Sequence, residues 1–451
     1  MSIPLKLLVA GLALLVLNLQ LCAQVFFSPS GSYGVDGGPT SLTAADVNGD
    51  GKPDLISANF NTNTLSVLTN NGSGGFELMG SYTVGNNPIA VTAADVNGDN
   101  KVDLISANHG WPPVYGNTLS VLTNDGSGHF TFAASLVVGQ IPWSVAAADV
   151  NADGKMDLIS ANEGEGTLSV MTNDGCGSFT LSGKYSVASF TTSVTTADVN
   201  GDSMPDMICA VFSPIKPYVF LTGLTVFTNN GSGGFVLAAN LGAGSNPYAV
   251  TTADINSDGK VDLISDNPVI QNAKVSVFTN NGYGGFQLAP NYSLENKFAP
   301  VVADINGDGW VDLVCCNATN NIFIYTNNMN GGFALASTLV LGSNPTWFVT
   351  SDVSGDGRLD LISQNNDSTL SVFTNVLTFL PQLALKRSNN NVIVSWPSSW
   401  TGWAGWNLEA STSLNSPNWT TFSGMIGDNG TTQTATNSTS PGNLFFRLAH
   451  P

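Results

Sequence analysis

Residues 46–54 read DVNGDGKPD, and the architecture follows from this nine-residue pattern because the 451-residue chain contains it seven times. Each copy has Asp at positions 1, 5 and 9, and six of the seven have Asn at position 3. The copies recur every 48 to 56 residues and begin at Asp46, Asp95, Asp149, Asp198, Asp254, Asp304 and Asp352. A period near 50, with strand-like segments between the loops, is typical of a β-propeller.

The acidic loops also predict a metal. Oxygen ligands at alternate positions, with Gly allowing a sharp turn, suit Ca²⁺. We expect up to seven structural Ca²⁺ ions, and three carboxylates within nine residues would repel one another without a cation. The predicted metal-binding residues are Asp46, Asn48, Asp50, Lys52, Asp54, Asp95, Asn97, Asp99, Lys101, Asp103, Asp149, Asn151, Asp153, Lys155, Asp157, Asp198, Asn200, Asp202, Met204, Asp206, Asp254, Asn256, Asp258, Lys260, Asp262, Asp304, Asn306, Asp308, Trp310, Asp312, Asp352, Ser354, Asp356, Arg358 and Asp360.

The charge distribution agrees with this interpretation. The chain has 32 acidic and 13 basic residues, a net charge of −19, and 21 of the acids lie in the loops. An acidic surface or tail would spread its charge more widely. Seven Ca²⁺ ions would bring the balance to −5. The chain has no basic stripe, so nucleic acid is not an expected partner.

The N-terminus predicts the compartment. Residues 1–23 have an early Lys6, an apolar run and a small residue at the expected cleavage point, Ala23, as in a secretory signal peptide. A membrane anchor is the weaker alternative because Asn18 and Gln20 interrupt the short apolar run. We therefore expect a secreted protein, at the cell surface or in the periplasm as alternatives, with no membrane span after cleavage.

One repeat reads as four short strands, at residues 89–96, 103–108, 118–124 and 130–138. The seventh repeat lacks the fourth strand, whereas residues 25–35 precede the first loop and resemble the fourth-strand segment 76–84. We expect this N-terminal segment to complete blade seven, because a closed ring leaves no exposed strand edges. The predicted propeller covers residues 24–377.

The repeats resemble the FG-GAP/VCBS repeats of the integrin α-subunit propeller and its bacterial secreted relatives, over about residues 25–375. The resemblance rests on the seven DxNxDGxxD-like loops and implies an all-β, seven-bladed propeller with Ca²⁺ between the first and second strands of each blade. The loops depart from the pattern at a few positions. Ser203 replaces Gly at position 6, and Ser tolerates left-handed backbone poorly, so we expect this loop to bind Ca²⁺ most weakly.

Residues 378–451 break the repeat pattern. They read as five or six short strands, which suggests a small β-sandwich similar to fibronectin-III-like appendages. Five Trp residues here could fill a core or stack on sugars, and core filling is the preferred interpretation. They are Trp396, Trp400, Trp403, Trp406 and Trp419.

Catalytic motifs are weak. None of the three His residues lies in a motif with a nucleophile or a metal partner. Glu163 and Glu165 could act as a general-acid pair, but their Gly-rich turn indicates solvated side chains. Cys209 and Cys315 occupy positions of small strand residues, and we expect inert thiols rather than a disulfide.

The connections opposite the acidic loops vary most. Two of them are longer than the rest, at residues 109–116 and 212–220, and both are rich in aromatic residues and Pro. Stiff aromatic loops suit a ligand, although ordinary loop drift is an equal alternative. The candidate ligand-binding residues are Trp111, Tyr115, Trp143, Tyr218 and Tyr248.

The sequence therefore predicts a secreted, calcium-binding, monomeric propeller that acts as a binding or adhesion module for a glycan or a surface protein. A secreted hydrolase or lyase acting on polysaccharide, with Glu163 or Glu165 as acid or base, is one alternative. A purely structural extracellular protein is the other.

Overall fold

A computed structural model of the chain describes two compact units, Val25–Val376 and a second unit that begins at Leu377. In the first, the described residues are 25–187, 190–212, 222–243, 247–267, 274–289, 300–316, 321–327, 332–341 and 345–376. In the second, they are 384–388, 391–397, 407–411, 420–422, 426–428, 432–438 and 445–449. The predicted signal peptide, residues 1–23, lies outside the described residues.

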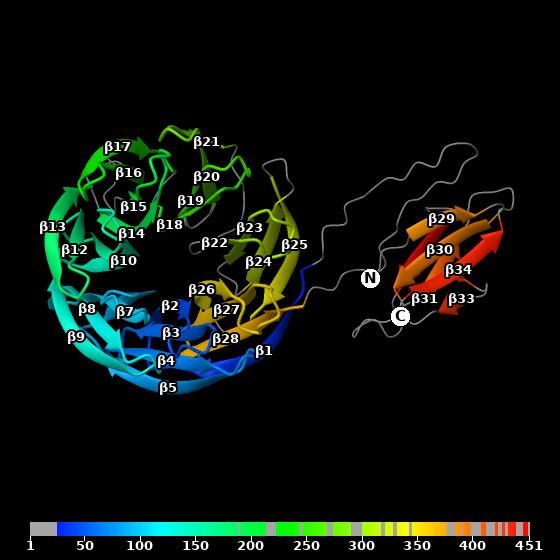
Figure 1. Cartoon of the computed structure of the whole chain (residues 1–451), viewed down its shortest axis with the longest axis horizontal. Coiled ribbons are helices and arrows are strands. Elements are labelled where there is room, and N and C mark those ends of the chain that lie inside the picture. The colour runs from blue at the N-terminus through cyan, green and yellow to red at the C-terminus, as the bar shows by residue number, and fades with distance from the viewer. Residues whose placement is uncertain are drawn as a thin grey trace. The chain divides into compact units, whose positions relative to one another are not determined.

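The first unit is a ring of seven four-stranded antiparallel sheets, so the predicted all-β, seven-bladed propeller is confirmed (Figure 1). Blades one to three contain β2 (Pro39–Ala45), β3 (Asp54–Asn59), β4 (Thr64–Asn70), β5 (Phe76–Thr83); β6 (Pro88–Ala94), β7 (Asp103–Trp111), β8 (Val114–Asn124), β9 (Phe130–Val137); β10 (Pro142–Ala148), β11 (Asp157–Asn162), β12 (Thr167–Asn173) and β13 (Phe179–Ser186).

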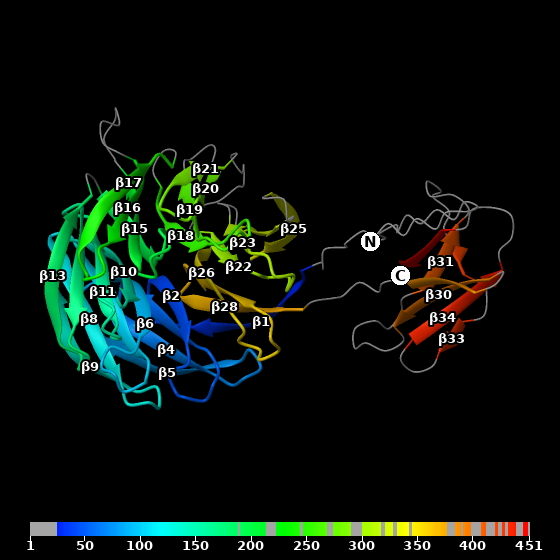
Figure 2. The same cartoon turned by 45° about the horizontal axis from the view of Figure 1, so that its top comes forward.

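Blades four to six contain β14 (Phe190–Ala197), β15 (Asp206–Phe212), β16 (Gly223–Asn229), β17 (Phe235–Leu241); β18 (Val250–Ala253), β19 (Asp262–Asn267), β20 (Lys274–Asn280), β21 (Phe286–Leu288); β22 (Val301–Ala303), β23 (Asp312–Cys316), β24 (Asn321–Asn327) and β25 (Phe333–Val340). The first strand of each blade lies nearest the centre of the ring, and the fourth strand lies at the outer edge (Figures 1 and 2).

The seventh blade joins the two ends of the propeller sequence. It contains β26 (Pro345–Ser351), β27 (Asp360–Asn365), β28 (Thr369–Asn375) and, as its fourth strand, β1 (Phe27–Gly34). β1 pairs antiparallel with β28 from Phe27 opposite Asn375 to Gly34 opposite Thr369. The N-terminal strand therefore supplies the strand that the seventh repeat lacks.

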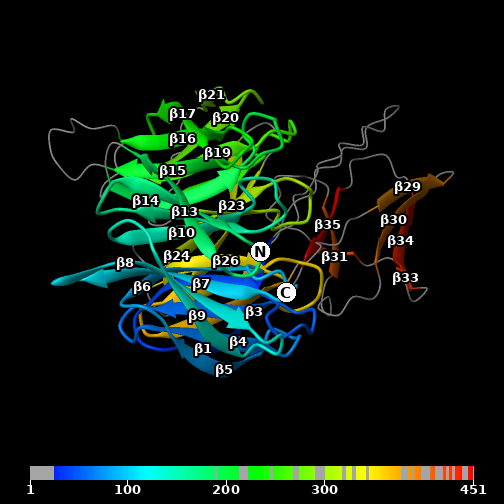
Figure 3. The ribbon, with the colours of Figure 1, turned by 60° about the vertical axis from the view of Figure 1, so that its left-hand side comes forward.

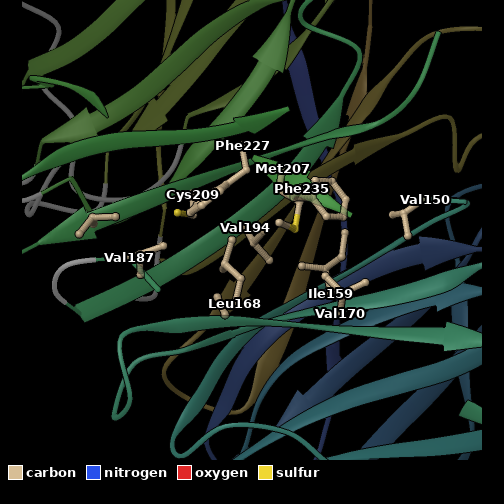
Figure 4. Packing of buried hydrophobic residues seen from close by; sticks show 12 residues of the cluster. Val150, Ile159, Leu168, Val170, Val187, Val194, Met207, Cys209, Phe227 and Phe235 are labelled. Atoms are coloured by element: carbon tan, nitrogen blue, oxygen red, sulfur yellow. The ribbon is translucent and has the colours of Figure 1, made fainter. Parts of the chain in front are cut away.

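The hydrophobic core lies between neighbouring blades. The second strand of a blade has adjacent blades on both faces, and all six residues of β3 are buried. This explains why these strands are apolar or small at nearly every position. Between blades three and four, twelve buried side chains form one cluster (Figure 4). They are Val150, Ile159, Ala161, Leu168, Val170, Val187, Val194, Met207, Cys209, Val211, Phe227 and Phe235.

The structure describes four cysteines, and no disulfide joins any two of them. Cys209, Cys315 and Cys316 are buried, and burial raises the pKa of the Cys209 thiol to about 12, so these three match the expectation of inert core residues. Cys176 differs because it is exposed.

The described strands of the second unit form two antiparallel sheets. One has the order β29 (Ala384–Ser388), β30 (Asn391–Pro397), β34 (Thr432–Ser438), β33 (Ile426–Asp428). The other has the order β32 (Thr420–Thr421), β31 (Asn407–Ser411), β35 (Phe445–Ala449). The β-sandwich stays a prediction, and the side chains of the five Trp residues lie outside the described part of this unit. No helix in the described part of the chain is long and apolar enough to cross a membrane.

Candidate functional site

Each acidic loop connects the first and second strands of its blade and has two residues with positive φ. In the first loop these are Gly49 (φ 76°) and Gly51 (φ 80°). The residues that replace Gly elsewhere keep this conformation, as Asn100 (φ 60°) and Ser203 (φ 68°) show. A non-Gly residue in this region costs roughly 1–2 kcal/mol. The loop geometry therefore survives at Ser203, at some cost in local strain.

Side-chain oxygens of the loop accept hydrogen bonds from its own backbone. In the first loop, Asp46 Oδ2 accepts from Gly51 N at 2.7 Å and Asp50 Oδ1 accepts from Lys52 N at 3.0 Å. Both bonds recur in all seven loops, at 2.7–2.8 Å and 2.8–3.0 Å respectively. Asn48 Oδ1 accepts from Asp50 N at 2.9 Å, as Asn does in six loops. These bonds hold positions 1, 3 and 5 in one tight turn.

The Asp at position 9 has a different environment from the other loop carboxylates, because it is fully buried in every loop. Asp54 Oδ2 accepts from Val47 N at 3.1 Å, and its Oδ1 accepts from Asn70 N, in β4, at 2.8 Å. Burial raises the pKa of this carboxyl, and the charges of Asp50 and Asp46 raise it less. Burial raises the pKa of Asp312 to about 7. Desolvation, more than repulsion between the loop carboxylates, therefore dominates the electrostatics at position 9.

Position 7 carries a basic side chain in five loops, and that side chain pairs with the Asp at position 5. The Nζ–Oδ2 distance is 3.3 Å for Lys52 and Asp50, and the equivalent Lys pairs lie at 3.4, 3.5 and 3.7 Å. Arg358 pairs with Asp356 in the seventh loop. Met204 and Trp310 occupy this position in the fourth and sixth loops and provide no charge. A basic side chain cannot ligate a cation, so only the backbone carbonyl at position 7 could do so.

The donor types of the loops fit Ca²⁺, which prefers carboxylate, amide and carbonyl oxygens. Each carboxylate also has lone pairs beyond those used by the backbone N–H groups. Among the residues that the structure describes, however, no three His, Cys, Asp or Glu side chains converge as a metal cluster. Calcium binding therefore stays a prediction based on donor chemistry and turn geometry.

Sequence reasoning missed the Asn that ends the third strand of every blade. Asn229 Nδ2 donates to the carbonyl of Val150, at position 2 of the preceding blade's acidic loop, at 2.7 Å. The same bond, at 2.7–3.0 Å, crosses all seven blade boundaries and closes on itself from Asn70 to Val353. Every third strand ends in Thr-Asn, and this repeated pair is the signal that could have revealed it. The acidic loops are thus joined into a continuous hydrogen-bonded ring.

At the opposite end of the propeller, five rings from blades one, two, three and five form a row of contacts, here called the aromatic rim. Trp143 lies 5.7 Å from Tyr248 with ring planes at 90°, and His109 lies 4.9 Å from Trp143 at 77°. Phe60 and Trp111 continue the row, 5.7 Å apart at 83°. Of the predicted ligand-binding residues, the structure thus unites Trp111, Trp143 and Tyr248.

The aromatic rim is partly exposed. Trp111 is 61% exposed and Tyr248 is 37% exposed. Trp111 ends β7 in a hairpin that extends beyond the neighbouring strands (Figure 3), and Tyr115, 53% exposed, lies in the same hairpin. Tyr218 lies outside the described residues. The hairpin therefore presents two of the predicted aromatic side chains to solvent.

The expectation that Glu163 and Glu165 are both solvated is wrong for Glu163. Its side chain is only 18% exposed, and its Oε2 lies 3.9 Å from His109 Nε2. Glu165 instead forms an ion pair with Lys184 at 3.0 Å. The two carboxylates therefore have separate partners, which does not favour a paired acid–base role.

Tyr248 is held in place by its backbone. Asp266, in β19, accepts from Tyr248 N at 2.9 Å, and Thr192 Oγ1 donates to Tyr248 O at 2.7 Å. Burial raises the pKa of the Tyr248 hydroxyl, and the charges of Glu163 and Asp266 add to this. Asp266 is fully buried, which raises its pKa to about 7, and its Oδ2 has no hydrogen-bond partner. Blade five thus fixes the end of the aromatic rim through a buried carboxyl.

Comparison with known protein families identifies one match. A family model described as FG-GAP-like repeat matches residues 46–106, 95–160, 149–209, 217–265 and 304–363, together more than half of the chain. No curated protein matches the sequence.

Solved structures share the fold. A crystal structure of BBS1N in complex with ARL6DN, soaked with lead, matches with a TM-score of 0.56 and 11% identity, covering 78% of this chain and 97% of that chain. A putative 6-phosphogluconolactonase from Bacteroides uniformis matches with a TM-score of 0.50 and 14% identity, covering 79% of this chain and 91% of that chain. At these identities the likeness concerns the fold alone.

Proposed function

This chain belongs to the FG-GAP-like repeat family, and from that premise we propose that it is a secreted binding module whose aromatic rim contacts an extracellular protein or glycan. Propellers of this family are generally interaction modules rather than enzymes. One chain of similar fold, BBS1N, was crystallised in complex with ARL6DN, which is an example of a partner protein bound by such a chain. Secretion is inferred from residues 1–23 alone.

The observation that carries the proposal is the aromatic rim itself. Five rings from four blades are in contact, and Trp111 at one end is 61% exposed. Burying large aromatic side chains is a main source of binding energy at interfaces. The connections that carry these rings are hydrogen-bonded to one another, for example from Glu163 N to Ile141 O at 2.8 Å. A preformed surface loses little conformational entropy when it binds a partner.

We propose in addition that the acidic loops bind Ca²⁺. Positions 1, 3, 5 and 9 and the carbonyl at position 7 would hold the ion, and the hydrogen bonds of position 9 would also anchor the loop to the core. A bound Ca²⁺ would neutralise the loop carboxylates and cross-link the turn. The loops lie at the end of the blades opposite the aromatic rim, so the ion would stabilise the ring rather than contact the partner.

The second candidate, a polysaccharide-acting enzyme, would use Glu163 or Glu165 as its acid or base. The two carboxylates have separate partners, Lys184 for Glu165 and His109 for Glu163, which does not favour a paired role. The likeness to a putative 6-phosphogluconolactonase supports the fold and not the reaction. Binding is therefore the better supported function.

The test is a glycan array and a capture assay on extracellular proteins, with calcium and with EDTA. The variant replaces Trp111, Tyr115, Trp143 and Tyr248 by Ala, and should lose binding with little change in melting temperature. Tyr283→Ala is the matched control, because Tyr283 is 88% exposed in a turn at the acidic-loop end. Full binding by the four-residue variant, or equal loss in the control, would remove the aromatic rim as the binding surface.

A further inference from the structure

Three of the five ring contacts in the aromatic rim are steeply inclined, whereas the His109 plane meets Phe60 at 52° and Trp111 at 31°. Neighbouring planes meet at 90° between Trp143 and Tyr248, 77° between His109 and Trp143, and 83° between Phe60 and Trp111. In such an edge-to-face contact, the faces of two adjacent rings meet at a steep angle and form a corner. A sugar ring stacks best on one flat aromatic face, whereas a compact cation can contact the electron-rich faces of two rings at a corner.

A carboxylate lies beside these corners. Glu163 Oε2 is 3.9 Å from His109 Nε2, and the Glu163 charge contributes to the raised pKa of Tyr248. Its side chain is 18% exposed, so it is partly withdrawn from water while remaining accessible. Among the described residues, the imidazole of His109 is its nearest ionisable neighbour, and no Lys or Arg pairs with it. The aromatic rim therefore combines ring faces with a carboxylate that pairs with no Lys or Arg among the described residues.

The number of acceptors selects among cations. A primary ammonium has three N–H donors and a guanidinium has five, and each donor removed from water needs an acceptor. Glu163 is the one described carboxylate that contacts the aromatic rim through a side chain, since the Asp266 carboxyl is fully buried and bonds to backbone N–H groups. A quaternary ammonium has no N–H donors, and it needs only ring faces and one counter-charge.

We propose that the aromatic rim binds a quaternary ammonium group, with Trp143 and Tyr248 contacting its methyl groups and Glu163 supplying the counter-charge. The inference rests on the proposed binding function and names the chemistry of its ligand. The same group occurs on a trimethylated lysine of a protein and on phosphocholine attached to a glycan or lipid. A protein or glycan partner of the propeller could therefore present it.

The experiment is ligand-observed NMR titration of the whole mature protein. The probes are choline, its uncharged isostere 3,3-dimethyl-1-butanol, and ethanolamine, which carries a primary ammonium. Choline should bind saturably and at least tenfold more tightly than either of the others. Glu163→Gln should weaken choline binding at least tenfold, and Trp143→Leu should do the same. Glu165→Gln should leave the affinity unchanged, because Glu165 lies in the same turn but pairs with Lys184.

Two further probes separate the sources of the group. Tighter binding of acetyl-trimethyllysine amide than of phosphocholine would indicate a protein partner, and the reverse would indicate a decorated glycan or lipid. Equal binding of choline and its uncharged isostere, or an unchanged affinity in Glu163→Gln, would overturn the proposal. If a Trp111, Tyr115, Trp143 and Tyr248 variant loses its partner while choline never binds, the binding function stands and only the ammonium assignment fails.

Discussion

The hydrogen-bonded ring of Asn side chains can be tested by replacing Asn229 with Ala. This change removes the Nδ2 bonds to Val150 O (2.7 Å) and Pro205 O (3.1 Å) and the bond that Oδ1 accepts from Gly231 N (2.9 Å). A net hydrogen bond contributes roughly 1 kcal/mol, and a buried carbonyl left without a partner costs roughly 1–3 kcal/mol. We therefore expect a loss of about 3 to 5 kcal/mol in the free energy of unfolding.

The adjacent Asn230 provides a matched control. Its Oδ1 accepts from Ser232 N and Gly234 N within an exposed turn, so Asn230→Ala should cost less than about 1 kcal/mol. The assay is urea unfolding of the whole chain, followed by a thermal melt. For a unit that spans Val25–Val376, about 4 kcal/mol corresponds to a shift of about 5 °C. Equal losses for the two variants, or a loss below about 1 kcal/mol for Asn229→Ala, would refute the idea that this bond holds adjacent blades together.

Three other predictions concern the closure of the ring by the N-terminal strand, the buried carboxyl of Asp266, and the calcium affinities of the first and fourth acidic loops. Deleting residues 25–35 should lower the melting temperature sharply, because β28 then loses its partner; an unchanged melt would contradict closure through this strand. Asp266 has a folded-state pKa of about 7, above its ordinary 3.8, so stability should fall as pH rises from about 4 to about 7. Asp266→Asn should therefore be more stable than the native chain at about pH 8, by at most about 4 kcal/mol in urea unfolding, and equally stable near about pH 4. If the variant is no more stable at the higher pH, the raised pKa of Asp266 is wrong. In calcium, Asp50→Ala should lower the melting temperature more than Asp202→Ala, since the strained Ser203 loop is expected to bind the ion weakly. The reverse order would contradict this, and would indicate that the residue at position 7, Lys52 in one loop and Met204 in the other, has the larger effect.

The repeated sequence made the propeller predictable. Seven loops in register define the blades, and the strand that follows each loop is apolar because both of its faces are buried, as in β3. The missing fourth strand of the last repeat also predicted where residues 25–35 would lie. These features are local or periodic, so they can be recognised without knowing which residues meet in space.

The contacts across blades were not predictable in the same way. Asn229 bonds to a carbonyl 79 residues earlier, and nothing in the local sequence specifies that partner. Trp143 meets Tyr248 although blade four lies between them in the sequence. No local pattern singled out His109, which the closed ring places against Glu163. The aromatic residues themselves were predicted, but their inclined ring planes and the nearby carboxylate depend on the closed ring.

The loop electrostatics also required the structure. Sequence reasoning stressed repulsion among three carboxylates, but Lys52 pairs with Asp50 and backbone N–H groups bond to Asp46 and Asp54. Position 9 is buried, so desolvation dominates its pKa. These contacts stabilise the turn to some extent without an ion, and exposed pairs such as Lys52 and Asp50 contribute little.

The most direct test of calcium stabilisation is the melting temperature of residues 24–451 in about 1 mM calcium compared with EDTA. If each loop binds with a dissociation constant of about 0.1 mM, each site adds roughly 1.4 kcal/mol, and seven add on the order of 10 kcal/mol. We predict that EDTA lowers the melting temperature by more than about ten degrees and that Mg²⁺ restores little of it, because Mg²⁺ demands stricter octahedral geometry. A melting curve that is the same in calcium and EDTA would contradict calcium stabilisation of the propeller.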